Sequence, residues 1–469
     1  MILRPQQSFG ETMFADAELG DRRRTKRLVK LTDQMCKHPG GSLPEKLRSP
    51  KDLKALYRLC DRAEVTHAAL MQSVRQAVLS DIEQRADDTI LIVHDSTELD
   101  YTTHQSLADQ LGQVGRGLKR GYICHNSLAV MPEGREVVGL LNQILHHRVT
   151  APKKETLQGR RQRESRESRL WLLGTQHLPA DRRFVDVADQ GADTFEFLEH
   201  EVHSGRRFVI RAHFARKASP GHEPSAPTTT IHDYGRDLPA IGGAIVTVVA
   251  QPRHGRRATR PARTARLLIS AGPLLVHRPH AKHGNHGVEP LPMWLVRVWE
   301  LYPPKDAEPI EWFLLTNEPV TSLADAERVI NWYRTRWVSE EFHKAIKTGC
   351  QVEQMQFTDT SRLEPMIAVL STVATTLLNL RAASQLPDAE TRKASTLIDT
   401  AYVEVLSAWR YQKVKKLTVH EFFFALARLG GHQNRRSDKR PGWLILWRGW
   451  TTLQAMVDGA DVKQGRNCG

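Results

Sequence analysis

Four side chains that could act on a phosphodiester recur at helical spacing between residues 331 and 347. Tyr333, Arg336, Glu340 and Lys347 fall within about 60° of one another on a helical wheel. The segment contains no Gly or Pro and follows 322–325, a start similar to a capping box, so we expect one helix. Apolar residues on its other faces indicate burial, and a buried carboxylate needs a cationic partner or a metal ion. A solvated charged face is the alternative interpretation.

Two aspartates could join Glu340 in a metal site. Residues 89–95 and 184–189 are short apolar runs that end in Asp95 and Asp189, so both predict buried strands. An aspartate in this position is usually a turn or cap residue. Functional residues nevertheless gather at the carboxyl ends of strands in open α/β sheets. Three carboxylates favour a site for Mg²⁺ or Mn²⁺, and two such ions could activate a water or 3′-hydroxyl and stabilise the leaving oxygen of a phosphodiester.

The elements that would position these residues alternate between strands and helices. The strand that ends at Asp95 is followed by predicted strands at 125–131 and 136–145 and by a helix that ends at Leu173. The strand before Asp189 comes next, and a helix at 195–201 and a strand at 207–211 follow it. This is the order of a ribonuclease-H-like fold. We therefore expect an α/β protein whose mixed-sheet catalytic core occupies residues 76–385, with a β-rich insertion at about 212–320.

Helical regions flank this core. Residues 1–75 are helical and basic, with five cations among the six residues from Arg22 to Arg27. These cations indicate either a solvated helix start or contacts with DNA phosphates. Residues 386–469 predict a C-terminal helical domain, in which Trp443, Trp447 and Trp450 recur at helical spacing and indicate a core stripe or an oligomer face.

The composition limits the classes of partner. The 469 residues include 67 Lys plus Arg against 53 Asp plus Glu, a net charge of +14, which favours a polyanionic partner such as nucleic acid. We see no apolar run of transmembrane length and no signal-peptide core, and the five cysteines have no CxxC spacing. These features predict a protein of a reducing cytoplasm with no membrane segment. Neither a zinc module nor a nucleotide-binding P-loop is indicated.

Three further patterns lie outside the expected carboxylate site or beside it. His277, His280, His283 and His286 recur every three residues, but the surrounding Pro and Gly residues indicate a polar loop near nucleic acid rather than a zinc site. Six arginines between residues 253 and 266, with no acid among them, indicate either a solvated loop or a DNA-facing patch. His94 directly precedes Asp95, and its role stays open.

The sequence resembles the DDE cut-and-paste transposases of the bacterial insertion-sequence-four group, and within it the transposon-five type. The Tyr-x2-Arg-x3-Glu-x6-Lys spacing that begins at Tyr333 is the signature of that family. The other matching segments run along most of the chain, at residues 19–29, 95–97, 189–193, 207–211, 312–320, 336–349 and 427–431. One departure is that Gln-Gly follows Asp189, where the family usually has Arg-Glu.

The resemblance implies a role for each matching residue. Asp95, Asp189 and Glu340 would form the catalytic triad and bind two Mg²⁺ ions, for which Mn²⁺ would substitute. Trp312 would stack against a base flipped out of the DNA. The alternative interpretation is that Trp312 is a core residue of a strand. The implied DNA contacts are Arg23, Arg24, Arg27, Arg211, Trp312, Tyr333, Arg336 and Lys347.

The expected function is that of a transposase. The enzyme would bind the terminal inverted repeats of a transposon, cut them through a hairpin intermediate and join them to target DNA. It would assemble as a homodimer on double-stranded DNA through its C-terminal domain, in the bacterial cytoplasm at the nucleoid. The alternatives are a ribonuclease-H-like nuclease without strand transfer and a non-cleaving, DNA-binding inhibitor of transposition.

Overall fold

The computed structural model describes most of the chain and divides it into two compact units. The described residues are 8–463, except 86–88, 150–153, 157–158, 160–162, 224–225, 249, 251–260, 280–286, 288, 306, 436–437 and 439. The first unit comprises Met1–Asp88, Ser96–Val149 and Val338–Gly469, and the second comprises Thr89–Asp95 and Thr150–Trp337. The domain boundaries expected near residues 75 and 385 both fall within the first unit, and they stay a prediction.

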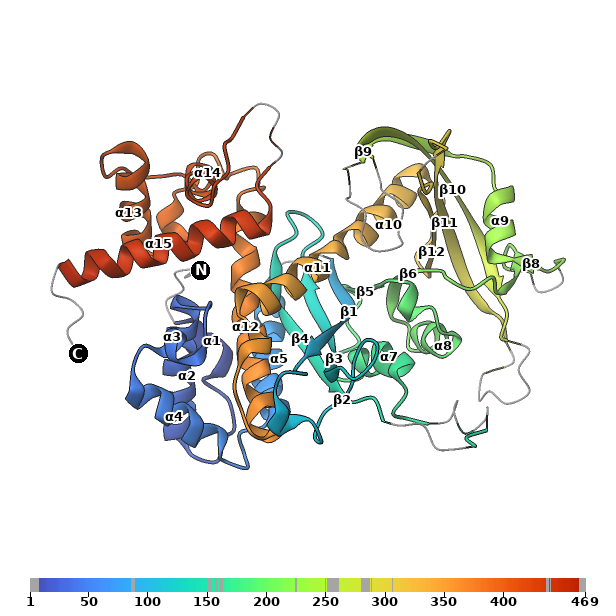
Figure 1. Cartoon of the computed structure of the whole chain (residues 1–469). Helices are drawn as coiled ribbons and strands as arrows, with labels where there is room; N and C mark the ends of the chain where they lie inside the picture. Colours follow the sequence, from blue (N-terminus) through green and yellow to red (C-terminus); the bar gives the residue numbers. More distant parts are fainter. Residues whose placement is uncertain are drawn as a thin grey trace. The chain divides into compact units, whose positions relative to one another are not determined.

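The first unit begins with five helices (Figure 1): α1 (Phe9–Phe14), α2 (Arg22–Lys37), α3 (Leu43–Leu47), α4 (Pro50–Cys60) and α5 (His67–Glu83). Helix α2 starts where Asp21 caps it by accepting a hydrogen bond from the Arg23 backbone N–H. It buries Leu28, Leu31 and Met35, which share one face. Its cations are therefore left on the exposed side.

A β-hairpin forms the strand layer of the first unit. Strands β3 (Arg120–Val130) and β4 (Val137–His146) are antiparallel, and the short β2 (Gly112–Gln113) pairs with β3. Helix α5 packs on β4 and approaches it closely, because a Cβ on Gly139 would lie 2.3 Å from the Val78 side chain. The predicted strands at 125–131 and 136–145 are thus confirmed, with a longer first strand.

Helix α12 (Thr360–Ala383) is the central apolar helix of the first unit. It is long and apolar enough to cross a membrane, but it packs on α5 and β4 and most of its apolar stretch is buried. That burial is typical of the core helix of a protein outside the membrane.

The C-terminal helices α13 (Thr400–Tyr411), α14 (Val419–Leu429) and α15 (Trp443–Lys463) share a core of their own. Trp450 stacks on Tyr402 with ring centroids 5.0 Å apart, and Trp443 stacks on Trp447. Trp443 and Trp450 are buried. The tryptophan stripe therefore contributes to the core of the unit.

The second unit begins with parallel strands. Strand β1 (Ile90–Asp100) starts in this unit, where Ile90 to His94 pair in parallel with β5 (Phe184–Ala188), which in turn pairs in parallel with β6 (Arg207–Arg211). The helices α7 (Leu170–Thr175) and α8 (Phe195–His203) flank β5 in the sequence. The remainder of β1 belongs to the first unit.

Antiparallel strands extend this sheet beyond β6. The order continues through β12 (Glu311–Thr316), β11 (Leu291–Leu301), β10 (Arg263–Val276), β7 (Lys217–Pro220) and β8 (Thr229–Thr230), and β9 (Gly242–Val248) also pairs with β10. The short helix α9 (Ile231–Asp237) contacts β10 and β11. The chain therefore has the expected mixed α/β fold, with a large mixed sheet and helices at both ends, whereas its ribonuclease-H-like identity stays a prediction.

The expected single helix from residue 331 to 347 is wrong. Helix α10 (Leu323–Thr335) ends before Arg336, helix α11 (Trp337–Lys344) follows, and the chain then makes a π-helical turn at Ala345–Gly349. The Thr335 hydroxyl donates to the Asn331 carbonyl at 3.0 Å, a side-chain bond that bends helices. Tyr333 and Arg336 belong to the second unit and Glu340 and Lys347 to the first, and Glu340 is partly exposed rather than buried.

Candidate nucleic-acid interface and catalytic site

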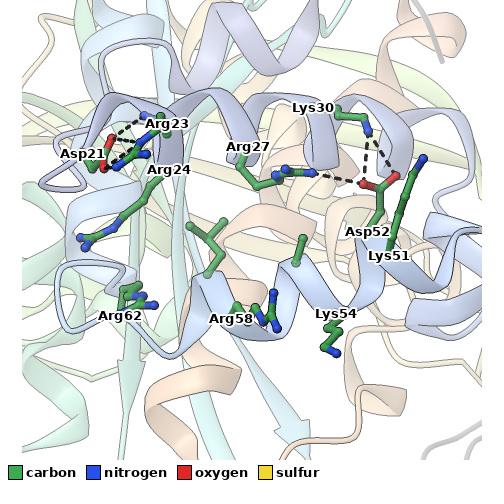
Figure 2. A pocket seen from close by; sticks show the side chains of 12 residues that line it. Asp21, Arg23, Arg24, Arg27, Lys30, Lys51, Asp52, Lys54, Arg58 and Arg62 are labelled. Atoms are coloured by element: carbon green, nitrogen blue, oxygen red, sulfur yellow. Dashed lines mark hydrogen bonds and ion pairs between the residues drawn. The ribbon is translucent and has the colours of Figure 1, made fainter.

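A pocket lined with cations lies between α2 and α4 in the first unit. Figure 2 shows the side chains from both helices that line this pocket. The volume of the pocket is about 840 Å³. Its lining contains eight cationic side chains, Arg23, Arg24, Arg27, Lys30, Lys51, Lys54, Arg58 and Arg62, and two acids, Asp21 and Asp52. We call it the α2–α4 groove. A surface of this charge suits a polyanion.

The buried carboxylate of Asp52 organises one end of the groove. It accepts hydrogen bonds from Lys30 at 3.2 Å, Gln34 at 3.1 Å and Arg27 at 3.3 Å. Burial alone would raise the pKa of Asp52, but the bonds from Gln34 and Lys30 outweigh it and hold the pKa below its usual value. Asp52 thus joins α4 to α2 and aligns two of the cations.

All three predicted N-terminal contacts line this groove. The Arg23 side chain is 91% exposed and donates to Asp21 at 2.8 Å. Arg24 pairs with Glu64 at 2.9 Å and donates to the Leu19 carbonyl. The structure therefore brings Arg23 and Arg24 together with Arg27 on one surface.

The cations of α4 were missed in the sequence. Lys51, Lys54 and Arg58 follow one another at intervals of three and four residues, which places them on one face of α4, and Arg62 follows soon after the helix ends. That periodicity could have identified the second wall of the groove. The run from Arg22 to Arg27 drew attention because its cations are consecutive.

Asp95 and Asp189 lie at corresponding ends of neighbouring parallel strands in the second unit. His94 pairs with Ala188, the last residue of β5, so Asp95 is the next residue of β1 and Asp189 directly follows β5. The backbones of two paired strands are about 4.8 Å apart. Asp95 is buried. The structure therefore places both predicted residues where the pairing of β1 with β5 stops. The strand β1 itself continues to Asp100, so the expectation that it ends at Asp95 is wrong.

The turn after β5 fixes Asp189 and Asp193. The Asp189 carboxylate accepts a hydrogen bond from the Gly191 N–H at 2.8 Å and caps a short 3₁₀ turn. A Cβ on Gly191 would lie 2.5 Å from the Trp171 ring, so this turn requires glycine for its close approach. The fully buried Asp193 accepts bonds from the backbone N–H groups of His213 and Phe214. Asp193 is thus structural.

Asp95 has a cationic partner in this unit. The Arg336 guanidinium donates from Nη1 to Asp95 Oδ2 at 2.8 Å. Carboxylates at strand ends are the oxygen donors that Mg²⁺ prefers, so Asp95 and Asp189 fit that ion by ligand type. Glu340 belongs to the first unit, and among the described residues no group of three or more His, Cys, Asp or Glu side chains is arranged to hold a metal ion. The complete triad stays a prediction.

An aromatic pair stands beside Arg211. The rings of Trp312 and Tyr333 meet edge to face with centroids 5.2 Å apart, and Trp312 is partly exposed. Burial raises the pKa of the Tyr333 phenol, while Arg211 and Arg336 oppose the rise, so Tyr333 is a neutral hydrogen-bonding group near neutral pH. Four predicted DNA contacts, Arg211, Trp312, Tyr333 and Arg336, therefore belong to one unit.

Lys347 lies in the first unit, within the π-helical turn. Its ammonium is 4.0 Å from the Glu353 carboxylate, and about a third of the side chain is exposed. The same Glu353 oxygen accepts the Asp100 N–H at 2.8 Å. Lys347 is therefore accessible from solvent and held near one acid of its own unit.

A smaller pocket of about 350 Å³ adjoins Arg211. Sequence patterns gave no sign of it, because its lining comes from four separated segments that include Gln190, His232, Arg236 and Phe313. Arg236 pairs with Glu311 of β12, which also lines the pocket. Both cations of this pocket are thus next to the strand that carries Trp312.

The remaining sequence patterns resolve only in part. His277 bonds to the Ser219 hydroxyl at 2.8 Å, whereas His280, His283 and His286 lie outside the described residues. Most of the arginine-rich run, residues 253 to 260, also lies outside them. Arg263 forms a two-bond pair with the buried Glu300, so it is a structural residue of the sheet.

One family of known proteins matches the chain. Residues 6–65 match the family model described as transposase DNA-binding. The matched segment contains α1 to α4 and all the cations that line the α2–α4 groove. This similarity supports a DNA-binding transposase.

Proposed function

We propose that this protein is a DDE transposase that binds transposon ends through its N-terminal helices and cuts and joins DNA with divalent cations. The similarity of residues 6–65 to transposase DNA-binding domains is the observation that carries the proposal. We assign it to the insertion-sequence-four group, of the transposon-five type, because of the signature that begins at Tyr333.

The α2–α4 groove is proposed to bind the terminal inverted repeats. Its eight cations can replace the counterions of a DNA backbone, which makes binding strong and dependent on salt. The Arg23 side chain is 91% exposed, so it could exchange its bond to Asp21 for one to a phosphate or a base edge.

Asp95, Asp189 and Glu340 are proposed to hold two Mg²⁺ ions. When bound, such ions activate an attacking oxygen and stabilise the leaving oxygen. Each reaction step would form one P–O bond and break another. Water would make the first nick, and the freed 3′-hydroxyl would attack the opposite strand to form a hairpin. A second water would reopen the hairpin, and the regenerated 3′-hydroxyl would attack a phosphodiester of the target DNA. The order β4, β3, β1, β5, β6 supports a ribonuclease-H-like core, because β1 starts beside β5 and continues beside β3.

Residues around the carboxylates are proposed to hold the DNA. Arg336 and Lys347 would bind backbone phosphates, and the Tyr333 hydroxyl would donate a hydrogen bond to a phosphate oxygen. The partly exposed Trp312 offers a surface on which a base unstacked by a tight DNA turn can stack, with Arg211 beside it. A homodimer formed on DNA through the C-terminal helices, in the bacterial cytoplasm at the nucleoid, completes the proposal.

The test uses purified protein and a labelled duplex that carries the inverted repeats flanking the gene. We expect Mg²⁺-dependent nicks, hairpins and joined products from the wild-type chain. Asp95→Ala, Asp189→Ala and Glu340→Ala should each abolish all three products and leave the affinity for end DNA within about twofold, because the groove is untouched. Cleavage that survives any one substitution would refute the triad.

The product pattern separates the alternatives. Nicks without hairpins or joined ends would identify a nuclease that lacks strand transfer. Tight binding of the repeats without any cleavage would identify an inhibitor of transposition. Either result would overturn the proposed activity while leaving DNA binding in place.

A further inference from the structure

A buried polar network lies behind Asp95 and Asp189. His94 Nε2 and Asp186 Oδ1 are 2.7 Å apart, and both side chains are essentially inaccessible to solvent. Arg206 donates from Nε to the other Asp186 oxygen at 2.8 Å. Glu201 is also fully buried and lies 4.0 Å from the same Arg206 nitrogen. Four ionisable groups from β1, β5, α8 and the start of β6 therefore share one interior site.

The network occupies the face of the sheet opposite to the two aspartates. Ile92 pairs with Asp186 in the parallel register, so these two side chains point to the same face, and His94 follows two residues later on that face. Asp95 is the next residue, and its side chain points to the other face.

The hydrogen-bonded pairing of β1 with β5 stops at this point. The last paired residues are His94 and Ala188, and β5 itself ends at Ala188. Asp95 and Asp189 therefore lie just beyond the ladder that holds the two strands together. The bond from His94 to Asp186 links the two strands through the last residue of β1 that pairs with β5.

The charges of the network favour a fixed geometry. Burial alone would raise the pKa of Asp186, but the bonds from His94 and Arg206 outweigh it and keep Asp186 ionised. Burial and the nearby Asp186 raise the pKa of Glu201 well above its usual value and so favour its neutral form. Arg206 and Asp186 then form a pair whose ionised oxygens must keep their donors, because an unpaired buried charge is costly.

We propose that His94 is a positioning residue whose bond to Asp186 holds β1 and β5 at a fixed separation next to Asp95 and Asp189. This inference rests on the proposed function, in which Asp95 and Asp189 are metal ligands. Removing a residue that orients a metal ligand without touching the metal commonly weakens metal binding by about 10-fold to 100-fold. A mere core residue would change stability and leave the strand ends and the metal affinity as they were.

The test compares three variants of the full chain. His94→Leu removes the bond and leaves the pair of Arg206 with Asp186, whereas His94→Gln can place an amide N–H where Nε2 lies. The matched control is Arg263→Met, which breaks the buried pair with Glu300 on strands β10 and β11 of the same unit. Thermal unfolding tests whether each variant folds. Binding of DNA that carries the terminal inverted repeats gives the fraction of each protein preparation that is competent to bind.

Two measurements decide the proposal. Hydrogen exchange of peptides that cover residues 93–97 and 187–192 should be about tenfold faster in His94→Leu than in the wild type, and unchanged in His94→Gln and Arg263→Met. Mn²⁺ binding to the DNA complex, followed by the electron paramagnetic resonance of free Mn²⁺, should weaken by about tenfold in His94→Leu alone. Equal behaviour of His94→Leu and Arg263→Met in exchange would overturn the positioning role.

The two proposals fail in different ways. If the wild-type complex binds no Mn²⁺ and cuts no DNA, the proposed function is wrong, and the exchange comparison alone decides whether His94 holds the strand ends. If the wild type binds Mn²⁺ and His94→Leu binds it equally well, the positioning role is wrong and the proposed function stands.

Discussion

Arg336 occupies one oxygen of Asp95 in the DNA-free chain, and this contact leads to a prediction for a single residue. The guanidinium that donates to Asp95 Oδ2 at 2.8 Å places a positive charge beside this proposed ligand, and that charge repels a divalent cation. Arg336→Gln should therefore tighten the binding of Mn²⁺ to the DNA-free protein by about threefold to tenfold. The same change should slow DNA cleavage, because Arg336 is also proposed to hold a phosphate.

The measurement is a Mn²⁺ titration of the DNA-free protein, followed by single-turnover cleavage. Arg336→Lys is the matched comparison, because it keeps the charge and loses the planar fork. Unchanged or weaker Mn²⁺ binding in Arg336→Gln would show that Arg336 does not compete with a metal ion at Asp95.

At the scale of elements, Asp52 joins α4 to α2 and makes their stability depend on pH. The pKa of Asp52 is lower in the folded chain than in the unfolded chain, so its contribution is present above about pH 4, the unfolded value, and disappears as the pH falls through the folded value. Asp52→Asn should cost about 1–2 kcal/mol near pH 7, because the buried carboxylate bonds two cations.

Hydrogen exchange of the α2 and α4 amides checks this expectation. The difference between Asp52→Asn and the wild type should be constant from pH 7 to about pH 5 and should shrink below about pH 4. Asp61→Asn, a partly exposed acid just after α4, is the control and should leave α2 protected. A difference that does not depend on pH would mean that Asp52 acts through packing rather than charge.

The same elements explain how far the sequence could lead. The runs before Asp95 and Asp189 predicted both strands, because a short apolar run is a local signal, but they did not predict that β1 continues to Asp100. The break at Arg336 was not predictable in this way, since it depends on whether the Thr335 hydroxyl bonds the backbone. The bond from His94 to Asp186 joins residues 92 positions apart, and no local pattern reports such a pair.

At the scale of the whole molecule, the proposed function divides between DNA binding by the α2–α4 groove and cleavage by the carboxylates. The double substitution Lys54→Ala with Arg58→Ala should weaken the binding of end DNA and reduce the slope of log affinity against log salt by about two, because each lost phosphate contact contributes about one. The single-turnover cleavage rate at saturating protein should stay within about twofold of the wild type. Asp189→Asn should do the reverse, abolishing cleavage and leaving the salt slope unchanged.

Lys26→Ala is the matched control for the groove. Lys26 is an exposed cation of α2 that does not line the groove, so its removal lowers the net charge without removing a proposed contact. Affinities measured by anisotropy at four salt concentrations give the slopes. If Lys26→Ala lowers the slope as much per charge as the groove variant, binding depends on overall charge rather than on the groove. In that case the segment that resembles transposase DNA-binding domains attracts DNA without positioning it for cleavage.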